Sequence, residues 1–286
     1  MLTFSYAILV LTLIGIIAAI ILYFVAQKFK VFEDPRIDLV SEALPGANCG
    51  GCGHTGCRAF AEAIVKKESL EGMNCPVGGE LTMSNVASVM GIEAVATLPK
   101  VAVIRCNGGK KNTNAKVNYD GVKDCLYAHM TFSSEGGCPN GCLGLGNCVT
   151  VCQFDAIYIN EETGLPEVDE EKCVACGACV TACPRKIIEL RNKGIKNRRI
   201  FVSCVNTEKG GAAKKNCSVA CIGCGKCKLA CKFDAITIEN NLAYIDYNKC
   251  KLCRKCAVEC PTGAIWEINF PLKKAEKEAV LEESQA

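Results

Sequence analysis

Cysteine is the residue type whose number and spacing in this chain could do chemistry. The chain has 24 cysteines in 286 residues, and most of them lie between Gly137 and Trp266. Three runs in this stretch have gaps of two, two and three residues: Cys173, Cys176, Cys179 and Cys183; Cys221, Cys224, Cys227 and Cys231; and Cys250, Cys253, Cys256 and Cys260. A fourth, altered run consists of Cys138, Cys142, Cys148 and Cys152.

These gaps are typical of the two-cluster bacterial ferredoxin pattern. A gap of two residues lets three thiolates of one short loop bind three irons of a cubane. The cysteine three residues further on points to the neighbouring cluster. Four such runs therefore predict two ferredoxin-like units that hold four [4Fe–4S] clusters.

The first unit departs from the pattern at one ligand. When residues 138–148 are aligned with 217–227, Leu145 stands opposite Cys224, and leucine cannot bind iron. We expect Cys138 to supply the missing thiolate. The predicted ligand sets are then Cys138, Cys142, Cys148 and Cys183; Cys152, Cys173, Cys176 and Cys179; Cys221, Cys224, Cys227 and Cys260; and Cys231, Cys250, Cys253 and Cys256.

A separate group of cysteines precedes the ferredoxin units. It consists of Cys49, Cys52, Cys57 and Cys75, and its first members stand in a glycine-rich stretch. Glycines let the backbone fold closely around a bulky inorganic ligand. This group predicts a fifth cubane, with zinc as the main alternative.

Four cysteines remain, and they are Cys106, Cys125, Cys204 and Cys217. They could hold a sixth cluster, or they could be buried structural thiols. Cys106 and Cys204 each follow an apolar segment and precede a Gly-Gly pair, so we expect a degenerate repeat before each ferredoxin unit. The Gly-Gly pairs match neither of the common nucleotide-binding motifs.

Composition restricts the class of protein. Only 6% of the residues are aromatic, so small cysteine-rich modules must take much of their folding energy from bound clusters. The formal net charge of +3 ignores thiolates and does not indicate a nucleic-acid partner. A disulfide framework or structural zinc would fit the repeated two-residue gaps poorly. The two histidines, His54 and His129, are expected to lie on the surface or beside the sites without binding metal. No residue is predicted to be catalytic.

The N-terminal segment predicts a membrane anchor. Residues 1–27 contain no charged side chain, and an apolar helix of about 20 residues can span a bilayer. Lys28 and Lys30 follow, which favours a cytoplasmic location for that end and an outside location for Met1. We therefore expect a single-pass protein of the cell membrane with its clusters on the cytoplasmic side. A cleaved signal peptide is the alternative.

The elements that position the cysteines are expected to be short, in an α+β chain. The expected parts are a transmembrane anchor over 1–28, a 4Fe–4S module over 29–80, a connecting segment over 81–137, a first ferredoxin-like domain over 138–193, a second connecting segment over 194–220, a second ferredoxin-like domain over 221–270 and a charged tail over 271–286. Apolar spacing predicts a helix over 58–68 and a buried strand over 101–105.

Residues 185–199 are strongly basic and have two possible roles. They contain Arg185, Lys186, Arg191, Lys193, Lys196, Arg198 and Arg199. Such a run could be a solvated face, or it could be a docking patch that attracts an acidic redox partner.

The order of these parts resembles the B-subunit family of the Rnf complex, the membrane ferredoxin:NAD⁺ oxidoreductase that pumps Na⁺ or H⁺. The resemblance depends on the sequence LPGANCGGCG, from Leu44 to Gly53, and on CLGLGNC, from Cys142 to Cys148. It implies a cytoplasmic subunit that accepts electrons from reduced soluble ferredoxin and relays them, through five to six [4Fe–4S] clusters, to other subunits. It also implies that those subunits carry the flavins, the NADH site and the ion path.

Two other interpretations remain open. The chain could be a polyferredoxin subunit of another membrane redox enzyme, such as a hydrogenase or a reductase. It could also be a redox-sensing or zinc-binding regulatory protein, which would not need a row of many clusters.

Overall fold

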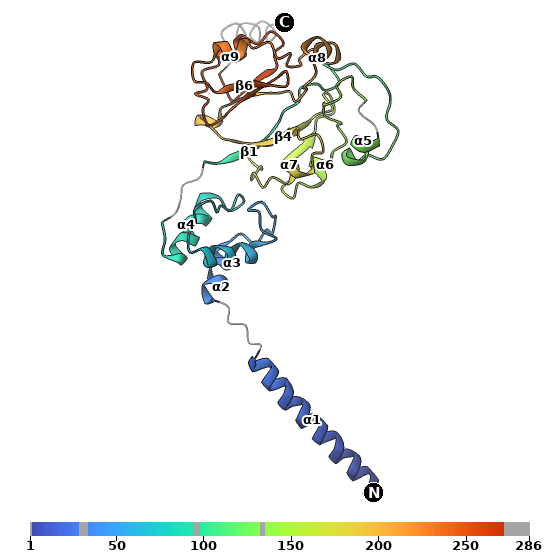
Figure 1. Cartoon of the computed structure of the whole chain (residues 1–286), viewed down its shortest axis with the longest axis vertical. Helices are drawn as coiled ribbons and strands as arrows, with labels where there is room; N and C mark the ends of the chain where they lie inside the picture. The colour runs from blue at the N-terminus through green and yellow to red at the C-terminus, as the bar shows by residue number, and fades with distance from the viewer. Residues whose placement is uncertain (1, 29–33, 94–97, 132–134, 272–286) are drawn as a thin grey trace, which may run out of the picture.

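The computed structural model describes residues 2–28, 34–93, 98–131 and 135–271. In Figure 1 the chain runs from helix α1 (Leu2–Lys28), through a small helical module, to a larger body that contains the described strands. Helices and strands are mixed, as the predicted α+β class requires. The tail predicted over 271–286 lies, after Pro271, outside the described residues.

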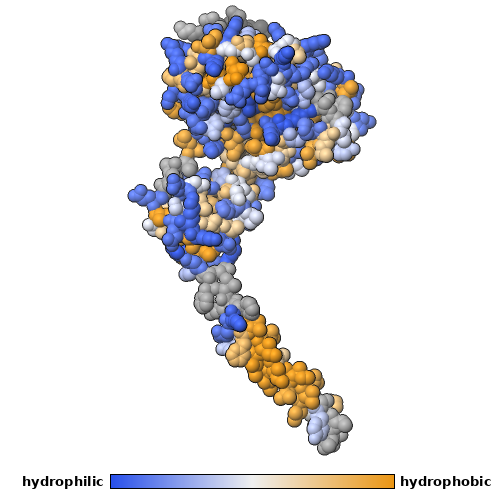
Figure 2. Space-filling model, in the orientation of Figure 1, coloured by the Kyte–Doolittle hydropathy of each residue, from blue (hydrophilic) through white to orange (hydrophobic). Residues whose placement is uncertain are grey.

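The predicted membrane anchor over 1–28 is not supported. Figure 2 shows hydrophobic residues along the visible face of α1. Among the residues that the structure describes, however, no helix is both long and apolar enough to cross a membrane. A span needs about 20 consecutive apolar residues. The single-pass membrane localisation and the anchor in the predicted fold class are corrected accordingly.

Three helices form the module that follows. They are α2 (Pro35–Ala43), α3 (Cys57–Lys67) and α4 (Gly79–Met90). Asp34 begins α2 as its N-cap, because its carboxylate accepts the backbone N–H of Arg36 at 2.9 Å. Phe60, Ile64 and Val86 are buried between the helices. The helix predicted over 58–68, with its apolar side inward, is therefore confirmed.

The first ferredoxin unit is built on a two-stranded antiparallel sheet that joins distant parts of the chain. β1 (Lys100–Ile104) pairs with β4 (Ile188–Asn192), and β1 confirms the strand predicted over 101–105. The intervening elements are α5 (Cys125–Thr131), α6 (Asn147–Thr150), the hairpin of β2 (Ile157–Ile159) with β3 (Pro166–Val168), and α7 (Ala178–Ala182).

The second unit repeats this plan. After the short 3₁₀ turn η1 (Ile195–Asn197), β5 (Arg199–Val202) pairs antiparallel with β8 (Ile265–Ile268). Between them lie α8 (Gly210–Asn216), α9 (Lys226–Ala230), the hairpin of β6 (Ile236–Glu239) with β7 (Leu242–Ile245), and α10 (Lys255–Val258). Each unit thus closes its cysteine loops with one outer sheet and one hairpin.

A left-handed residue precedes each short helix that follows a cysteine loop. Gly146, Gly177 and Gly225 have φ values of 87°, 82° and 80° before α6, α7 and α9. Glycine adopts this conformation without a steric penalty. The loop can therefore turn sharply and direct its cysteines inward.

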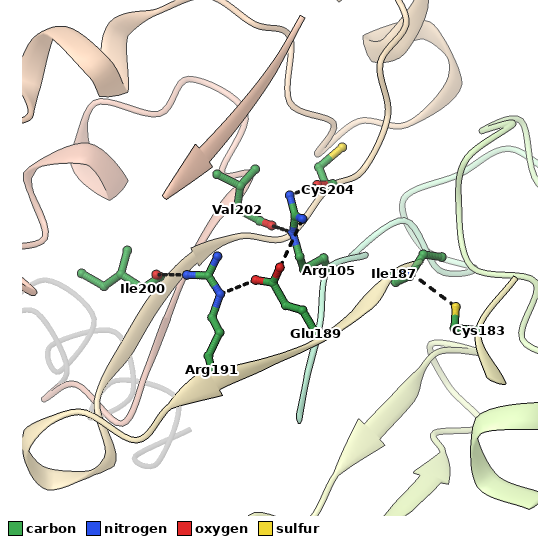
Figure 3. A network of polar contacts seen from close by, with 8 residues as sticks. All are labelled: Arg105, Cys183, Ile187, Glu189, Arg191, Ile200, Val202 and Cys204. Atoms are coloured by element: carbon green, nitrogen blue, oxygen red, sulfur yellow. Dashed lines mark hydrogen bonds and ion pairs between the residues drawn. The ribbon is translucent and has the colours of Figure 1, made fainter. Parts of the chain in front are cut away.

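A buried polar network joins the two units (Figure 3). Arg105, at the end of β1, donates to the backbone oxygens of Val202 and Cys204, both at 3.4 Å. Glu189 of β4 pairs with Arg105 and with Arg191. Arg191 also donates to the backbone oxygen of Ile200 at 3.2 Å. Because β1 and β4 belong to the first unit and β5 to the second, these contacts fix the two units to each other.

The basic stretch over 185–199 therefore has a structural role at its two most buried arginines. Arg191 and Arg199 are only 1% and 3% exposed. The guanidinium of Arg191 lies over the rings of Tyr244 and Tyr247, 5.3 and 5.6 Å from their centroids, and Arg199 pairs with Glu170. Neither a solvated face nor a docking patch describes these arginines.

Candidate iron–sulfur sites

Among the described residues, each ferredoxin unit contains two cavities that are lined by four cysteines each. The four sets are Cys125, Cys142, Cys148 and Cys183; Cys152, Cys173, Cys176 and Cys179; Cys221, Cys224, Cys227 and Cys260; and Cys231, Cys250, Cys253 and Cys256. Three sets are those expected from the crossed ferredoxin pattern. The structure brings these cysteines together from loops that are separated by tens of residues in the sequence.

The remaining set differs from the predicted one at a single position, where Cys125 takes the place of Cys138. The backbone N–H of Cys125 donates to Oδ1 of Asn147 at 2.7 Å, and Nδ2 of Asn147 donates to Asp124 at 2.8 Å. These bonds hold the start of α5 against α6. Asn147 thus holds the thiol of Cys125, which lies outside the altered run, at this cavity. Leu145 occupies the position of the missing ligand and cannot bind iron.

Cys138 lies instead in a group between the two units, which we call the interface group: Cys106, Cys138, Cys204 and Cys217. All four are buried. Burial, and then the neighbouring thiolates of Cys106, Cys204 and Cys217, raise the pKa of Cys138 to about 11. Three of the four cysteines left over in the sequence are therefore gathered here, and Cys138 replaces Cys125.

The loop with the first Gly-Gly pair is shaped to approach the interface group. A Cβ atom on Gly108 would lie 3.5 Å from Sγ of Cys217 and 3.6 Å from Sγ of Cys106, and 2.9 Å from Oγ1 of Thr113. Glycine is needed because a side chain would crowd this contact. The close approach of Thr113 therefore accounts for Gly108, and the sulfurs of Cys106 and Cys217 lie at ordinary contact distance.

The interface group joins equivalent positions of the two units. Cys106 follows β1 and Cys204 follows β5, while Cys138 and Cys217 precede the two runs at the same spacing. Nδ2 of Asn140 donates to Oδ1 of the fully buried Asn206 at 3.1 Å and ties the two loops together. The group thus lies where the two units meet, and each unit contributes two equivalent cysteines to it.

Backbone N–H groups are directed at cysteine sulfurs throughout these sites. The donors and acceptors are Gly144 to Cys142, Ala156 to Cys152, Ile187 to Cys183, Asn206 to Cys204 and Cys142 to Cys106, all at 3.4 Å, and Gly78 to Cys75 at 3.3 Å. Figure 3 shows the contact at Cys183. Such bonds stabilise thiolate charge and tune the reduction potential of a bound cluster.

Burial raises the pKa of many of these thiols. The pKa of Cys148 and of Cys227 is raised to about 11, and that of Cys179 and of Cys256 to about 12. Without iron the buried thiols hold their protons, and iron binding must displace them. Among the described residues, no three His, Cys, Asp or Glu side chains are close enough to share one metal ion. A cubane does not need such a cluster, because each of its irons binds one thiolate.

The N-terminal group is arranged around the buried thiol of Cys75. Burial raises the pKa of Cys75, and the thiolates of Cys57 and Cys49 add to this effect. Cys52 packs against the same helical core. The ring of His54 lies 5.3 Å from that of Phe60, so this histidine has a packing role.

The N-terminal module meets the first ferredoxin unit at Gly51. A Cβ atom on Gly51 would lie only 2.9 Å from both Cα and the carbonyl oxygen of Cys176, and 2.8 Å from Cγ of Pro76. The two cysteine-bearing loops are therefore in direct backbone contact, with no space for a side chain.

The cysteine groups form one continuous row. The N-terminal loop contacts Cys176 at Gly51, and Cys148 and Cys179 pack in one buried cluster. The backbone N–H of Cys142 donates to Sγ of Cys106 at 3.4 Å. In the second unit, Cys204, Cys221, Cys227 and Cys256 pack in one buried cluster. The N-terminal group stands at one end of the row, and the group of Cys231, Cys250, Cys253 and Cys256 stands at the other.

Comparisons with known proteins agree with these sites. Residues 44–77 match a family model described as a putative Fe-S cluster, and residues 137–187 and 220–264 match a 4Fe-4S dicluster domain. The first model covers the N-terminal group, and the second covers both ferredoxin units without Cys106, Cys125, Cys204 and Cys217. The predicted cofactor is confirmed: the chain holds several [4Fe–4S] clusters.

The chain is also similar to curated proteins over most of its length. It is 46% identical to the B subunit of the Na⁺-translocating ferredoxin:NAD⁺ oxidoreductase complex of Acetobacterium woodii, over 90% of this chain and 75% of the relative. It is 39% identical to the B subunit of the ion-translocating oxidoreductase complex of Methanosarcina acetivorans, over 91% of this chain and 96% of the relative. It is 40% identical to the B subunit of the proton-translocating ferredoxin:NAD⁺ oxidoreductase complex of Clostridium ljungdahlii, over 90% and 89%. The chain therefore belongs to the B-subunit family of ion-translocating oxidoreductase complexes.

Proposed function

We propose that this chain accepts electrons from a reduced soluble ferredoxin and relays them through its [4Fe–4S] clusters to other subunits of an ion-translocating ferredoxin:NAD⁺ oxidoreductase. The continuous row of cysteine groups carries this proposal. Electron transfer between carriers weakens steeply with distance, so a relay requires successive sites in close contact. The names of the relatives from Acetobacterium woodii and Clostridium ljungdahlii support the donor and the acceptor.

The ligands that we propose for the ferredoxin units are the four cysteine sets that line the cavities, with Cys125 in the first unit. The N-terminal site is proposed on Cys49, Cys52, Cys57 and Cys75. The cavities fit the group because thiols converge on them and backbone N–H groups are aimed at several of the sulfurs.

The interface group is proposed as a sixth site. Without a carrier there, the row would be broken between Cys142 of the first unit and Cys221 of the second. The alternative is that its cysteines are buried structural thiols. The backbone N–H groups that donate to Cys106 and Cys204 favour a charged, metal-bound form of these sulfurs.

Bound [4Fe–4S] clusters supply carriers that take up and release single electrons. The residues of this chain hold those carriers in order, exclude water by burial and direct N–H dipoles at the sulfurs. The buried pairing of Arg105 and Arg191 with Glu189 keeps the two ferredoxin units in register. No bond-making chemistry is required of this chain.

Metal analysis of the anaerobically purified chain tests this proposal. We expect about 24 iron atoms per chain if all six sites are filled, and about 20 if the interface group is structural. Electron paramagnetic resonance (EPR) spectra should show reducible [4Fe–4S] signals after addition of reduced ferredoxin. Stoichiometric zinc without a reducible signal would contradict the relay.

A further inference from the structure

The segments that carry the cysteine runs of the two ferredoxin units differ in the sign of their charge. Residues 221–260 of the second unit contain seven basic side chains against four acidic ones; the basic ones are Lys226, Lys228, Lys232, Lys249, Lys251, Arg254 and Lys255. Residues 138–183 of the first unit contain Lys172 as the one basic side chain, against seven acidic ones: Asp155, Glu161, Glu162, Glu167, Asp169, Glu170 and Glu171. Both units hold clusters, so compensation of cluster charge does not explain a difference between them.

The excess of lysine lies on the helices that cover the second unit's sites. α9 and α10 pack against each other and carry Lys226, Lys228 and Lys255, all exposed. The equivalent helices α6 and α7 of the first unit have the sequences NCVT and ACVTA and carry no charge. We call the surface formed by α9, α10 and the adjoining exposed Lys251 the lysine face.

Cluster ligands reach the surface beside the lysine face. Every cysteine of the chain lies in its described part, and Cys224 and Cys253 are the two that are exposed. Cys224 belongs to the group next to the end of the row, and Cys253 belongs to the end group itself. An electron can therefore enter the row here with the least protein between an external electron carrier and a cluster of this chain.

Apolar side chains are also exposed on the same helices. Leu229 of α9 is 88% exposed and Val258 of α10 is 66% exposed, and Phe233, which follows α9, is 44% exposed. Apolar contacts near the centre of a charged surface are typical of protein–protein interfaces. The combination fits a protein partner better than a small ion.

We propose that the lysine face is the docking surface for a small acidic protein electron carrier. This inference rests on the proposed function and specifies where the relay is entered. Long-range attraction between the lysines and an acidic carrier speeds encounter and orients the pair. The reduced carrier gives up one electron and this chain gains it, and no bond or proton is exchanged. The acidic segment 138–183 of the first unit repels such a carrier, so entry is favoured at the other end of the row.

The test compares two triple variants of the iron-loaded chain that have the same net charge. One removes lysines from the lysine face (Lys226→Gln, Lys228→Gln, Lys255→Gln). The control removes exposed lysines in and next to α8 (Lys209→Gln, Lys214→Gln, Lys215→Gln). In Figure 1, α8 lies apart from α9, to its right at the top of the larger body. The probe is a purified, acidic two-cluster ferredoxin, reduced and mixed with the chain by stopped flow, with affinity measured separately by calorimetry.

We expect the lysine-face variant to accept electrons about tenfold more slowly at low salt, with a flatter salt dependence and weaker binding. The α8 variant should match the unmodified chain, and all three proteins should have equal iron content and equal reduction by dithionite. Equal rates and affinities for both variants would overturn the docking surface alone. If dithionite reduces the unmodified chain but ferredoxin does not, the proposed donor is wrong. The proposed docking surface is then wrong as well.

Discussion

Gly51 lies against the backbone of Cys176, and the space between the two residues is too small for a side-chain carbon atom. One residue belongs to the N-terminal cysteine loop and the other to a cysteine loop of the first ferredoxin unit. The φ angle of Gly51 lies outside the left-handed region that favours glycine. Its lack of a side chain is therefore required by the contact and not by the local backbone conformation.

Substitution of Gly51 by alanine should separate these two loops. The added methyl group would overlap backbone atoms of Cys176, which costs about 1–3 kcal/mol or forces the loops apart. We expect unchanged iron content, weaker magnetic interaction between the two reduced sites in EPR spectra, and faster hydrogen exchange over 174–177. Gly211→Ala is a suitable control, because a Cβ atom there meets nothing within 4 Å. An unchanged EPR interaction in Gly51→Ala would show that the contact does not set the spacing of the sites.

Substitution of Cys125 by serine should remove or convert a cluster of the first ferredoxin unit. The cavity would keep three thiols, from Cys142, Cys148 and Cys183. We expect a loss of about one to four iron atoms per chain, measured by metal analysis, with a new three-iron EPR signal if only one iron leaves.

The Cys138→Ser variant is the matched comparison. It should leave the ferredoxin signals intact and alter the signal of the interface group, because Cys138 lies with Cys106, Cys204 and Cys217. The opposite pattern, in which Cys138→Ser removes a ferredoxin-unit cluster and Cys125→Ser does not, would restore the assignment expected from sequence spacing.

Substitution of Arg191 by methionine should destabilise the joint between the ferredoxin units. The guanidinium is buried among Glu189, Ile200 and aromatic rings, so its removal leaves Glu189 with Arg105 alone. We expect a loss of about 3 kcal/mol, seen as a lower melting temperature of the iron-loaded chain. Arg58→Met, at an exposed ion pair, should cost at most about 1 kcal/mol. Equal melting temperatures for the two variants would argue against a structural role for Arg191.

Removal of iron by an anaerobic chelator should affect the parts of the chain unequally. The core of the second unit contains five cysteines among its 14 buried residues, whereas the core of the N-terminal module contains one among 11. We expect the ferredoxin units to lose hydrogen-exchange protection while helices α2 to α4 keep theirs. Equal loss of protection in both parts would contradict this difference.

The local features of the sites were predictable from sequence, and the long-range ones were not. Cysteine spacing predicted the four cysteines that line three of the cavities, because the cysteines of one loop are a few residues apart. Spacing did not predict that Cys125 lines the remaining cavity in place of Cys138, because the hydrogen bond from Cys125 to Asn147 joins residues far apart in the sequence. One signal was present in the sequence: Cys138 and Cys217 are equivalent, so both were to be expected in the same group.

Charge along the sequence was a poor guide to the surface. Residues 185–199 are rich in arginine, but Tyr244 and Tyr247, about fifty residues later, cover Arg191. The lysines of α9 and α10 are spread over a longer stretch and are less conspicuous in the sequence. Their significance depends on the comparison with the uncharged helices of the first unit, which requires the fold.

The position of Cys217 sets the order in which this protein can mature. A ribosome releases the chain from its N-terminus, so the cysteines from Cys49 to Cys75 emerge together and can be filled early. On the proposed assignment, Cys106 and Cys138 remain unligated thiols until Cys204 and Cys217 have been synthesised. In that interval no second unit covers them, and oxidants or competing metal ions can reach their sulfurs. Insertion of iron and sulfide at the sixth site that we propose on the interface group would therefore be confined to a late stage of biosynthesis, under reducing conditions.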